Sequence, residues 1–118
     1  MDEKDPIQNL LTELRRGSLT MAAMGCLRTP HYGYALLQTL QEVGVAIDAN
    51  TLYPLLRRLE SQGFLSSDWD TTESRPRKYY TVSEAGRDAL SQLVSEWEHM
   101  QRSMTRIYEE VLQNGKLD

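Results

Sequence analysis

The sequence predicts a mainly α-helical chain with one small β-hairpin, and three observations support this prediction. Apolar residues recur at helical spacing through most of the 118 residues. Two short segments rich in aromatic and β-branched residues follow one another in the middle of the chain. The last third has the most regular apolar stripe, with gaps alternating between three and four residues. The expected order is helices, a hairpin and one long C-terminal helix.

The first part of the chain predicts two short helices. Asp5 is a favourable N-cap before Pro6, and an amphipathic helix is expected to end near Gly17. Ser18 can cap a second, more apolar helix, which must end before Pro30 because a proline disfavours helical geometry in the residue before it. The apolar residues of the first helix are Ile7, Leu10, Leu11 and Leu14.

A tight turn and a third helix follow. The helix is expected from about Tyr32 to Gly44, whose lack of a side chain suits the left-handed position after a helix. Its apolar positions are Tyr34, Leu36, Leu37 and Leu40. The run 45–47 could pair as a short strand.

A fourth helix is predicted between Asn50, a favoured N-cap, and Gly63. Pro54 is expected in its first turn, where a missing amide costs little. Leu52, Leu55, Leu56 and Leu59 follow helical spacing and predict the buried face. The side chains then left to face solvent or a partner are Thr51, Tyr53, Arg57, Arg58 and Ser61.

Two segments, 64–69 and 77–82, predict the strands of the hairpin. Pro76 lies at the edge of the loop, where a missing hydrogen-bond donor is tolerated. Neighbouring residues of a strand point to opposite faces, so one of Tyr79 and Tyr80 is expected in the core and the other half-exposed.

Ser83 is a good N-cap for a C-terminal helix that is expected to run to near Gln113, before Gly115. A domain of this size can cover only part of the apolar stripe, and a second copy of the helix is the simplest cover for the remainder. The sequence therefore predicts a homodimer. The stripe consists of Leu90, Leu93, Trp97, Met100, Met104, Ile107 and Val111.

Helix, turn, helix and then a hairpin is the order of a winged helix-turn-helix. The sequence also resembles the PadR family of transcriptional regulators, in its short subgroup with a single C-terminal helix, over about residues 17–98. The segments that carry the resemblance are His31 to Tyr34, Asn50 to Gly63, Arg75 to Tyr80 and Ser83 to Arg87, with Arg16-Gly17 and Trp97. The predicted parts are residues 1–82, a DNA-binding domain with N-terminal helices, and residues 83–118, a dimerisation helix.

The resemblance implies a dimeric transcriptional repressor that binds a double-stranded operator and is released by a small molecule or another signal. In multidrug-sensing relatives the matching tryptophan pair stacks on planar drugs, which implies an effector site at Trp97 with Leu93, Met100 and Met104. For Trp97, packing at the dimer seam is an equal alternative, and for Met100 and Met104 such packing is the favoured interpretation. The sequence departs from these relatives in its acidic N-terminus and in the polar, acidic loop 70–74.

Charge is compatible with a DNA-binding middle segment, although the formal net charge is -4. Residues 50–82 carry five basic and four acidic side chains, whereas acidic residues outnumber basic ones on both sides of that segment. Base or phosphate contacts are expected from the fourth helix, and phosphate contacts from the return strand of the hairpin. The predicted DNA-binding residues are Thr51, Tyr53, Arg57, Arg58, Arg75, Arg77 and Lys78.

Other classes of function have little support. His31 and His99 lie far apart, Cys26 has no second thiol, and no catalytic or phosphate-binding motif is present, so neither an enzyme nor a metal site or cofactor is expected. No apolar run is long enough to span a membrane, and with a lone cysteine this predicts a cytoplasmic protein. Two alternatives stay open: a protein-interaction module, and a repressor that needs no effector.

Overall fold

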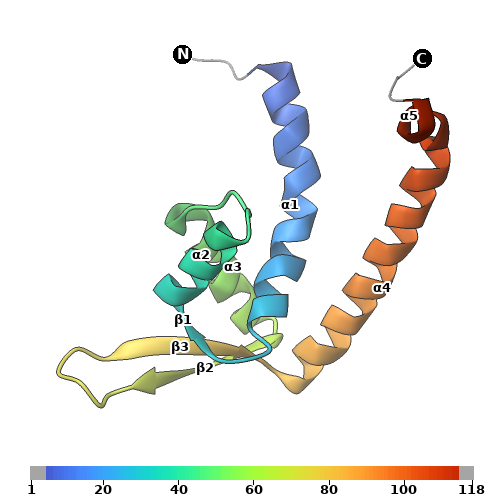
Figure 1. The fold of residues 1–118 in the computed structure, drawn as a ribbon. Coiled ribbons are helices and arrows are strands. Elements are labelled where there is room, and N and C mark those ends of the chain that lie inside the picture. Colours follow the sequence, from blue (N-terminus) through green and yellow to red (C-terminus); the bar gives the residue numbers. More distant parts are fainter. Residues whose placement is uncertain (1–4, 115–118) are drawn as a thin grey trace.

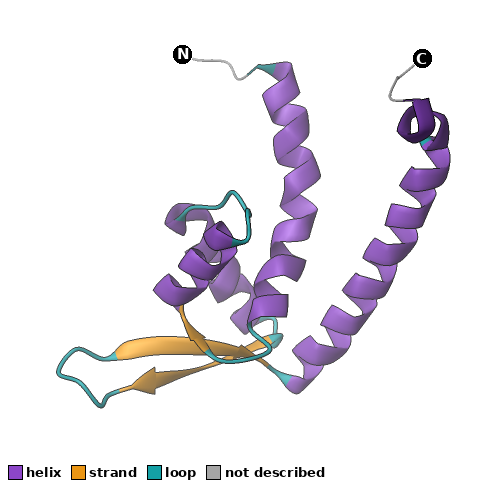
Figure 2. Cartoon of the chain, in the orientation of Figure 1, coloured by secondary structure: helices purple, strands orange, loops and turns teal. Residues whose placement is uncertain are grey.

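The structure is a computed structural model that describes residues 5–114 (Figure 1). Most of these residues are helical, and the strands form one small sheet (Figure 2). The mainly α-helical winged fold predicted from the sequence is therefore confirmed. The elements are α1 Pro6–Cys26, β1 His31–Tyr32, α2 Gly33–Glu42, α3 Ala49–Ser61, β2 Leu65–Asp70, β3 Arg77–Val82, α4 Glu84–Ile107 and α5 Glu109–Asn114.

The first helix, α1, is continuous where the sequence predicted two helices. Asp5 caps it as expected, its carboxylate accepting from the Ile7 amide at 2.9 Å. Ser18 starts no new helix, because its hydroxyl donates to the Arg15 carbonyl inside α1 at 2.8 Å. A glycine inside a helix costs only about 1 kcal/mol. Gly17 alone was therefore too weak a signal for a break.

The connection between α2 and α3 is not a strand, so the prediction of a strand at 45–47 was wrong. Gly44 has a φ of 93°, the left-handed position expected after α2. The Val45 amide then donates back to the Leu40 carbonyl at 2.9 Å, and Gln41 Nε2 donates to the Ile47 carbonyl at 3.0 Å. These local bonds satisfy the backbone without a strand partner.

The start of α3 lies earlier than predicted. The N-cap is Asp48, whose carboxylate accepts from the Thr51 amide at 2.9 Å, and not Asn50. The helix thus begins at Ala49, which moves Pro54 from the predicted first turn into the second. Gly63 has a φ of 88° and follows the end of the helix as expected.

The sheet has three antiparallel strands in the order β1-β3-β2. The hairpin of β2 and β3 was predicted to within one residue. The strand β1 was not, because it consists of only two residues, paired as His31↔Tyr80 and Tyr32↔Tyr79. Tyr80 is buried and Tyr79 half-buried, as strand alternation predicted.

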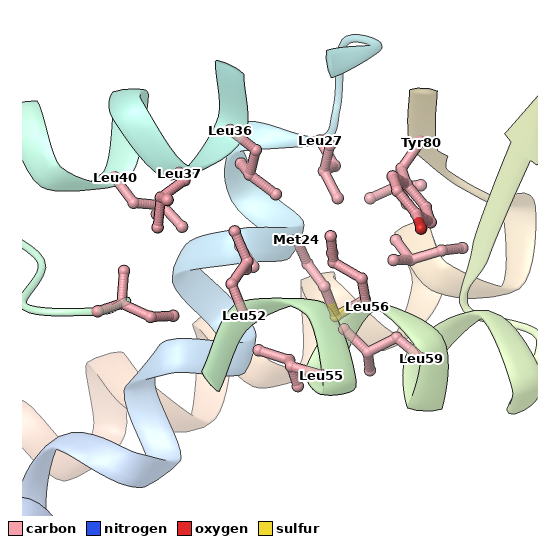
Figure 3. Close-up of a cluster of buried hydrophobic side chains, with 14 of the residues drawn as sticks. Met24, Leu27, Leu36, Leu37, Leu40, Leu52, Leu55, Leu56, Leu59 and Tyr80 are labelled. Atoms are coloured by element: carbon pink, nitrogen blue, oxygen red, sulfur yellow. The ribbon is translucent and has the colours of Figure 1, made fainter. Parts of the chain in front are cut away.

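The core lies where α1, α2 and α3 meet the sheet (Figure 3). The four predicted leucines of α3 are all buried there. Tyr34 was predicted among the apolar positions of α2, but it is 65% exposed because it lies on the outer side of the helix. The largest fully buried side chains are Met24, Leu27, Leu36, Leu40, Leu52 and Leu56.

The C-terminal helix begins as predicted and ends early. The Ser83 hydroxyl accepts from the Gly86 amide at 3.0 Å. The helix α4 stops at Ile107, and Tyr108 interrupts it before the short helix α5. The expected single helix to Gln113 is thus broken after 24 residues, and the predicted stop at Gly115 lies outside the described residues. Within residues 5–114, no helix is long and apolar enough to cross a membrane.

Candidate nucleic-acid interface

The exposed face of α3 is a direct result of its buried one. The leucines pack into the core, so residues on the opposite side, three and four apart, line up on the surface. This outer face consists of Asn50, Pro54, Arg57 and Ser61, all exposed. Asn50 was not among the predicted DNA-binding residues because the sequence favoured it as the N-cap. The earlier start of α3 places Asn50 inside the helix, with its side chain exposed on the outer face.

Thr51 and Arg58 lie two turns apart on one flank of α3, beside the outer face. Thr51 is exposed, and its amide is bound by the Asp48 cap. Arg58 lines an open cavity of 680 Å³ together with Thr20 of α1 and Asp88 of α4. Of the two adjacent arginines predicted to bind DNA, Arg57 therefore lies on the outer face and Arg58 on the flank.

Tyr53 lies on the other flank of α3 and packs on the start of α2. A Cβ placed on Gly33 would lie 2.6 Å from Cε1 of the Tyr53 ring, so the ring occupies the space that a side chain would need. Tyr53 is half-buried. Its ring helps to set the separation of α2 and α3, in addition to any contact with DNA.

The wing, defined here as β2, β3 and the loop 71–76, is attached to α3 through Glu60. Glu60 Oε1 lies 3.2 Å from Lys78 Nζ of β3, and Glu60 Oε2 accepts a hydrogen bond from the Ser67 hydroxyl of β2. The bonds from Ser67 and Lys78 hold the pKa of Glu60 below its usual value, and the same carboxylate raises the pKa of Lys78. The charge of Lys78 is thus paired within the chain.

The opposite face of the wing contacts Tyr32 of β1. The Tyr32 hydroxyl donates to the Asp70 carboxylate, and the Arg77 guanidinium lies 4.1 Å above the centre of the Tyr32 ring. The hydrogen bonds from Tyr32 and Thr72 lower the pKa of Asp70 to about 2. The same bond to Asp70 raises the pKa of Tyr32.

The three cations predicted to bind phosphate are therefore spread over the wing. Arg77 and Lys78 point to opposite faces, because neighbours on a strand alternate. Arg75 is exposed in the wing loop. The sequence placed these cations in one cluster, and the structure separates them.

A second candidate site lies between α1 and α4, which diverge away from the sheet (Figure 1). A groove of 550 Å³ is lined on α4 by the predicted residues Leu93, Trp97, Met100 and Met104. From α1 it takes Leu14 and Met21, which the sequence analysis did not connect with this site. Trp97 is 42% exposed in the single chain.

Two further side chains that could carry chemistry are His31 and Cys26. His31 Nδ1 lies 2.9 Å from the Thr29 carbonyl oxygen. Cys26 is partly buried, which raises the pKa of its thiol. Within residues 5–114, no three His, Cys, Asp or Glu side chains are grouped so that they could hold a metal ion.

Comparisons with known proteins agree with this architecture. The model of the PadR-like family of transcriptional regulators matches residues 24–92. A PadR family transcriptional regulator from Eggerthella lenta is 45% identical, with a TM-score of 0.81 over 87% of this chain and 92% of that one. A Streptococcus transcriptional regulator is 28% identical, with a TM-score of 0.74 over 81% of this chain and 97% of that one.

A curated relative, a transcriptional regulator of Mycobacterium tuberculosis, is 39% identical over 61 residues. The match covers 52% of this chain and 57% of the relative's length.

Proposed function

Because the chain belongs to the PadR-like family of transcriptional regulators, which are not enzymes, we propose that it is a repressor that binds a pseudo-palindromic operator as a homodimer. The observation that carries this proposal is the outer face of α3, where Asn50 and Arg57 are exposed opposite four buried leucines. In a helix-turn-helix the second helix enters the major groove. Here α3 is that helix, and it is called the recognition helix below.

The side chains on the outer face suit a DNA groove. Asparagine can form two hydrogen bonds to adenine, and arginine can do so to guanine or bind phosphate. Asn50 stands near the N-terminus of the recognition helix, the end that reaches base edges in helix-turn-helix complexes. We assign base contact to Asn50 and base or phosphate contact to Arg57. Arg75 at the wing tip is placed to meet the flanking phosphates.

The homodimer is supported by the apolar surface that a single chain leaves uncovered. From Leu93 to Ile107, the predicted stripe on α4 is 39% to 65% exposed, and Ile7, Leu10 and Leu14 are 62% to 76% exposed on α1. The Cα radius of gyration is 17.5 Å, against about 13.5 Å for a compact domain of this length. A second copy packed along α4 would cover the stripe and set the spacing of two recognition helices.

The groove between α1 and α4 supports binding of a small planar hydrophobic effector. Trp97 offers a flat aromatic face, and methionines form adaptable walls. An effector bound there would change the separation of the two recognition helices and so release the operator. If Trp97→Ala leaves both ligand binding and dimerisation unchanged, the groove has neither role, and the repressor is independent of such an effector.

A titration against DNA tests the proposed function. The purified protein is titrated at several salt concentrations against DNA from upstream of its own gene and against a scrambled duplex of equal length. We expect selective binding with two chains per duplex and an affinity that falls steeply with salt. Fragments enriched from sheared genomic DNA extend the test to other promoters. Equal, weak binding to every fragment would contradict the proposal and favour a protein-interaction module, in line with the net charge of -4.

A further inference from the structure

Glu60 is the one carboxylate of α3 that contacts the wing within the described residues, and it contacts both strands. Lys78 Nζ lies 3.2 Å from its Oε1, and the Ser67 hydroxyl donates to its Oε2. The side chains of Glu60 and Lys78 are each 31% exposed. A single side chain of the recognition helix is thus bonded to β2 and to β3 at once.

The register of the hairpin explains why the two wing residues reach the same carboxylate. Ser67 pairs with Tyr80, and Trp69 pairs with Lys78. Residues that pair directly, and residues two apart on one strand, share a face of the sheet. The Lys78 ammonium also lies 5.2 Å from the centre of the buried Tyr80 ring. The contact to Glu60 therefore connects the recognition helix to a rigid part of the wing.

The physical chemistry favours a geometric role for this contact over a large effect on stability. Partly exposed ion pairs add little to the free energy of unfolding. A lysine already paired with a carboxylate also has less to gain from a phosphate, since it must first lose its partner. The hydrogen bonds from Ser67 and Lys78 lower the pKa of Glu60, which keeps the pair charged at neutral pH.

We propose that Glu60 is a positioning residue that fixes the wing relative to the recognition helix, and that Lys78 serves this contact instead of binding phosphate. This inference rests on the proposed binding of an operator. It replaces the expectation, drawn from the sequence, that Lys78 contacts phosphate directly. The wing tip with Arg75 then reaches the DNA backbone only when Glu60 holds both strands.

The variants Glu60→Gln and Lys78→Gln, their combination, and the charge-exchanged pair Glu60→Lys with Lys78→Glu test the proposal. Glu73→Gln is the matched control, because it removes the same charge from an exposed position in the wing loop. We expect each single variant to lower operator affinity about tenfold, without additivity in the combined variant. Lys78→Gln should leave the salt dependence unchanged, and the exchanged pair should recover affinity.

Two results would overturn the proposal. If the salt dependence of operator binding falls by about one released counterion in Lys78→Gln, then Lys78 contacts a phosphate. Affinity that rises equally in Glu60→Gln and Glu73→Gln would show that Glu60 acts by its charge alone.

A readout without DNA separates this inference from the proposed function. Trp69 pairs with Lys78, so in a Trp97→Phe background its fluorescence reports the wing. We expect Glu60→Gln to shift this emission and the exchanged pair to restore it. Unchanged emission in Glu60→Gln would contradict the inference. If wild-type protein shows no operator preference, the proposed function fails, while the emission still decides the role of Glu60.

Discussion

The ring of Tyr53 lies directly on Gly33, and a Cβ at Gly33 would stand 2.6 Å from Cε1 and 2.9 Å from the hydroxyl oxygen of Tyr53. This contact joins the first residue of α2 to the recognition helix. Tyr53 therefore links the angle between α2 and α3 to the proposed DNA-binding surface, although the sequence suggested only a contact with DNA.

Gly33→Ala is expected to displace the Tyr53 ring and tilt α2 against α3. The ring can move, so we expect a moderate loss of stability, about 1–3 kcal/mol, together with weaker operator binding. Urea unfolding and DNA titration measure the two effects. Gly25→Ala is the control, because no atom lies within 4 Å of its Cβ position inside α1. Equal behaviour of the two variants would show that the Tyr53 contact has no consequence.

Gly86→Ala is expected to be the more damaging substitution. Its Cβ would lie 2.0 Å from the backbone oxygen of Phe64, which cannot move aside as a side chain can. We expect a loss of stability beyond that of Gly33→Ala, and a decrease in the melting temperature of several degrees for each kcal/mol lost. Thermal unfolding followed by circular dichroism checks this order, with Gly17→Ala as the open helical control. A melting temperature like that of wild type would contradict the close approach of α4 to Phe64.

Arg57→Ala is expected to weaken operator binding by about 1–3 kcal/mol if Arg57 binds a base, and to lower the salt dependence by about one counterion if it binds phosphate. The fold should be unaffected, because the side chain is exposed. Arg58→Ala, on the flank of the same helix, is the matched control and should have a smaller effect. A larger loss of affinity in Arg58→Ala than in Arg57→Ala would show that DNA contacts the flank of α3 and not its outer face.

Met100→Glu is expected to abolish the dimer and leave the monomer folded. Met100 is 49% exposed on the stripe, so the single chain tolerates a charge there, whereas the two-fold partner would bring a second charge close to it. Sedimentation equilibrium checks the mass. Arg102→Glu, on the opposite side of α4, should remain dimeric. If both variants are dimeric, the dimer interface does not lie on the apolar stripe of α4.

Asp70 should contribute stability above pH 4 and lose this contribution in more acidic solution. Its pKa is lowered from 3.8 to about 2 by hydrogen bonds from Tyr32 and Thr72. The unfolded chain therefore takes up the proton first as the pH falls, and the contribution disappears between about pH 4 and pH 2. Asp70→Asn should be less stable than wild type at pH 7, with a difference that shrinks below pH 4. Asp68→Asn is the control in urea unfolding, and an equal difference at pH 7 and pH 3 would contradict the role of Asp70.

The sequence predicted the elements whose signals are local and strong. The four leucines of α3, Gly44 and Gly63, and the Ser83 cap all appear where the pattern indicated. It failed where two local signals competed with each other. Asn50 was a plausible cap, but Asp48 lies two residues earlier and captures the Thr51 amide.

The sequence predicted which residue types make up the candidate site, but it predicted less well which residues contact one another there. Helical spacing identified Arg57 as exposed, and alternation placed Tyr80 in the core. No local pattern could show that Glu60 would meet Lys78, because the contact joins a helix to a strand 18 residues away. The strand β1 was missed for the same reason: its two residues are a strand only because β3 lies beside them.

A hydroxyl-radical footprint on the enriched operator tests the central claim most directly, namely that two copies present their recognition helices to successive major grooves. Wild-type protein should give two protected regions related by a two-fold axis and separated by about one helical turn, roughly 34–36 Å. Met100→Glu, the expected monomer, should lose this paired protection at the same concentration. A single unpaired region with wild-type protein, or paired protection that survives in a proven monomer, would contradict the account.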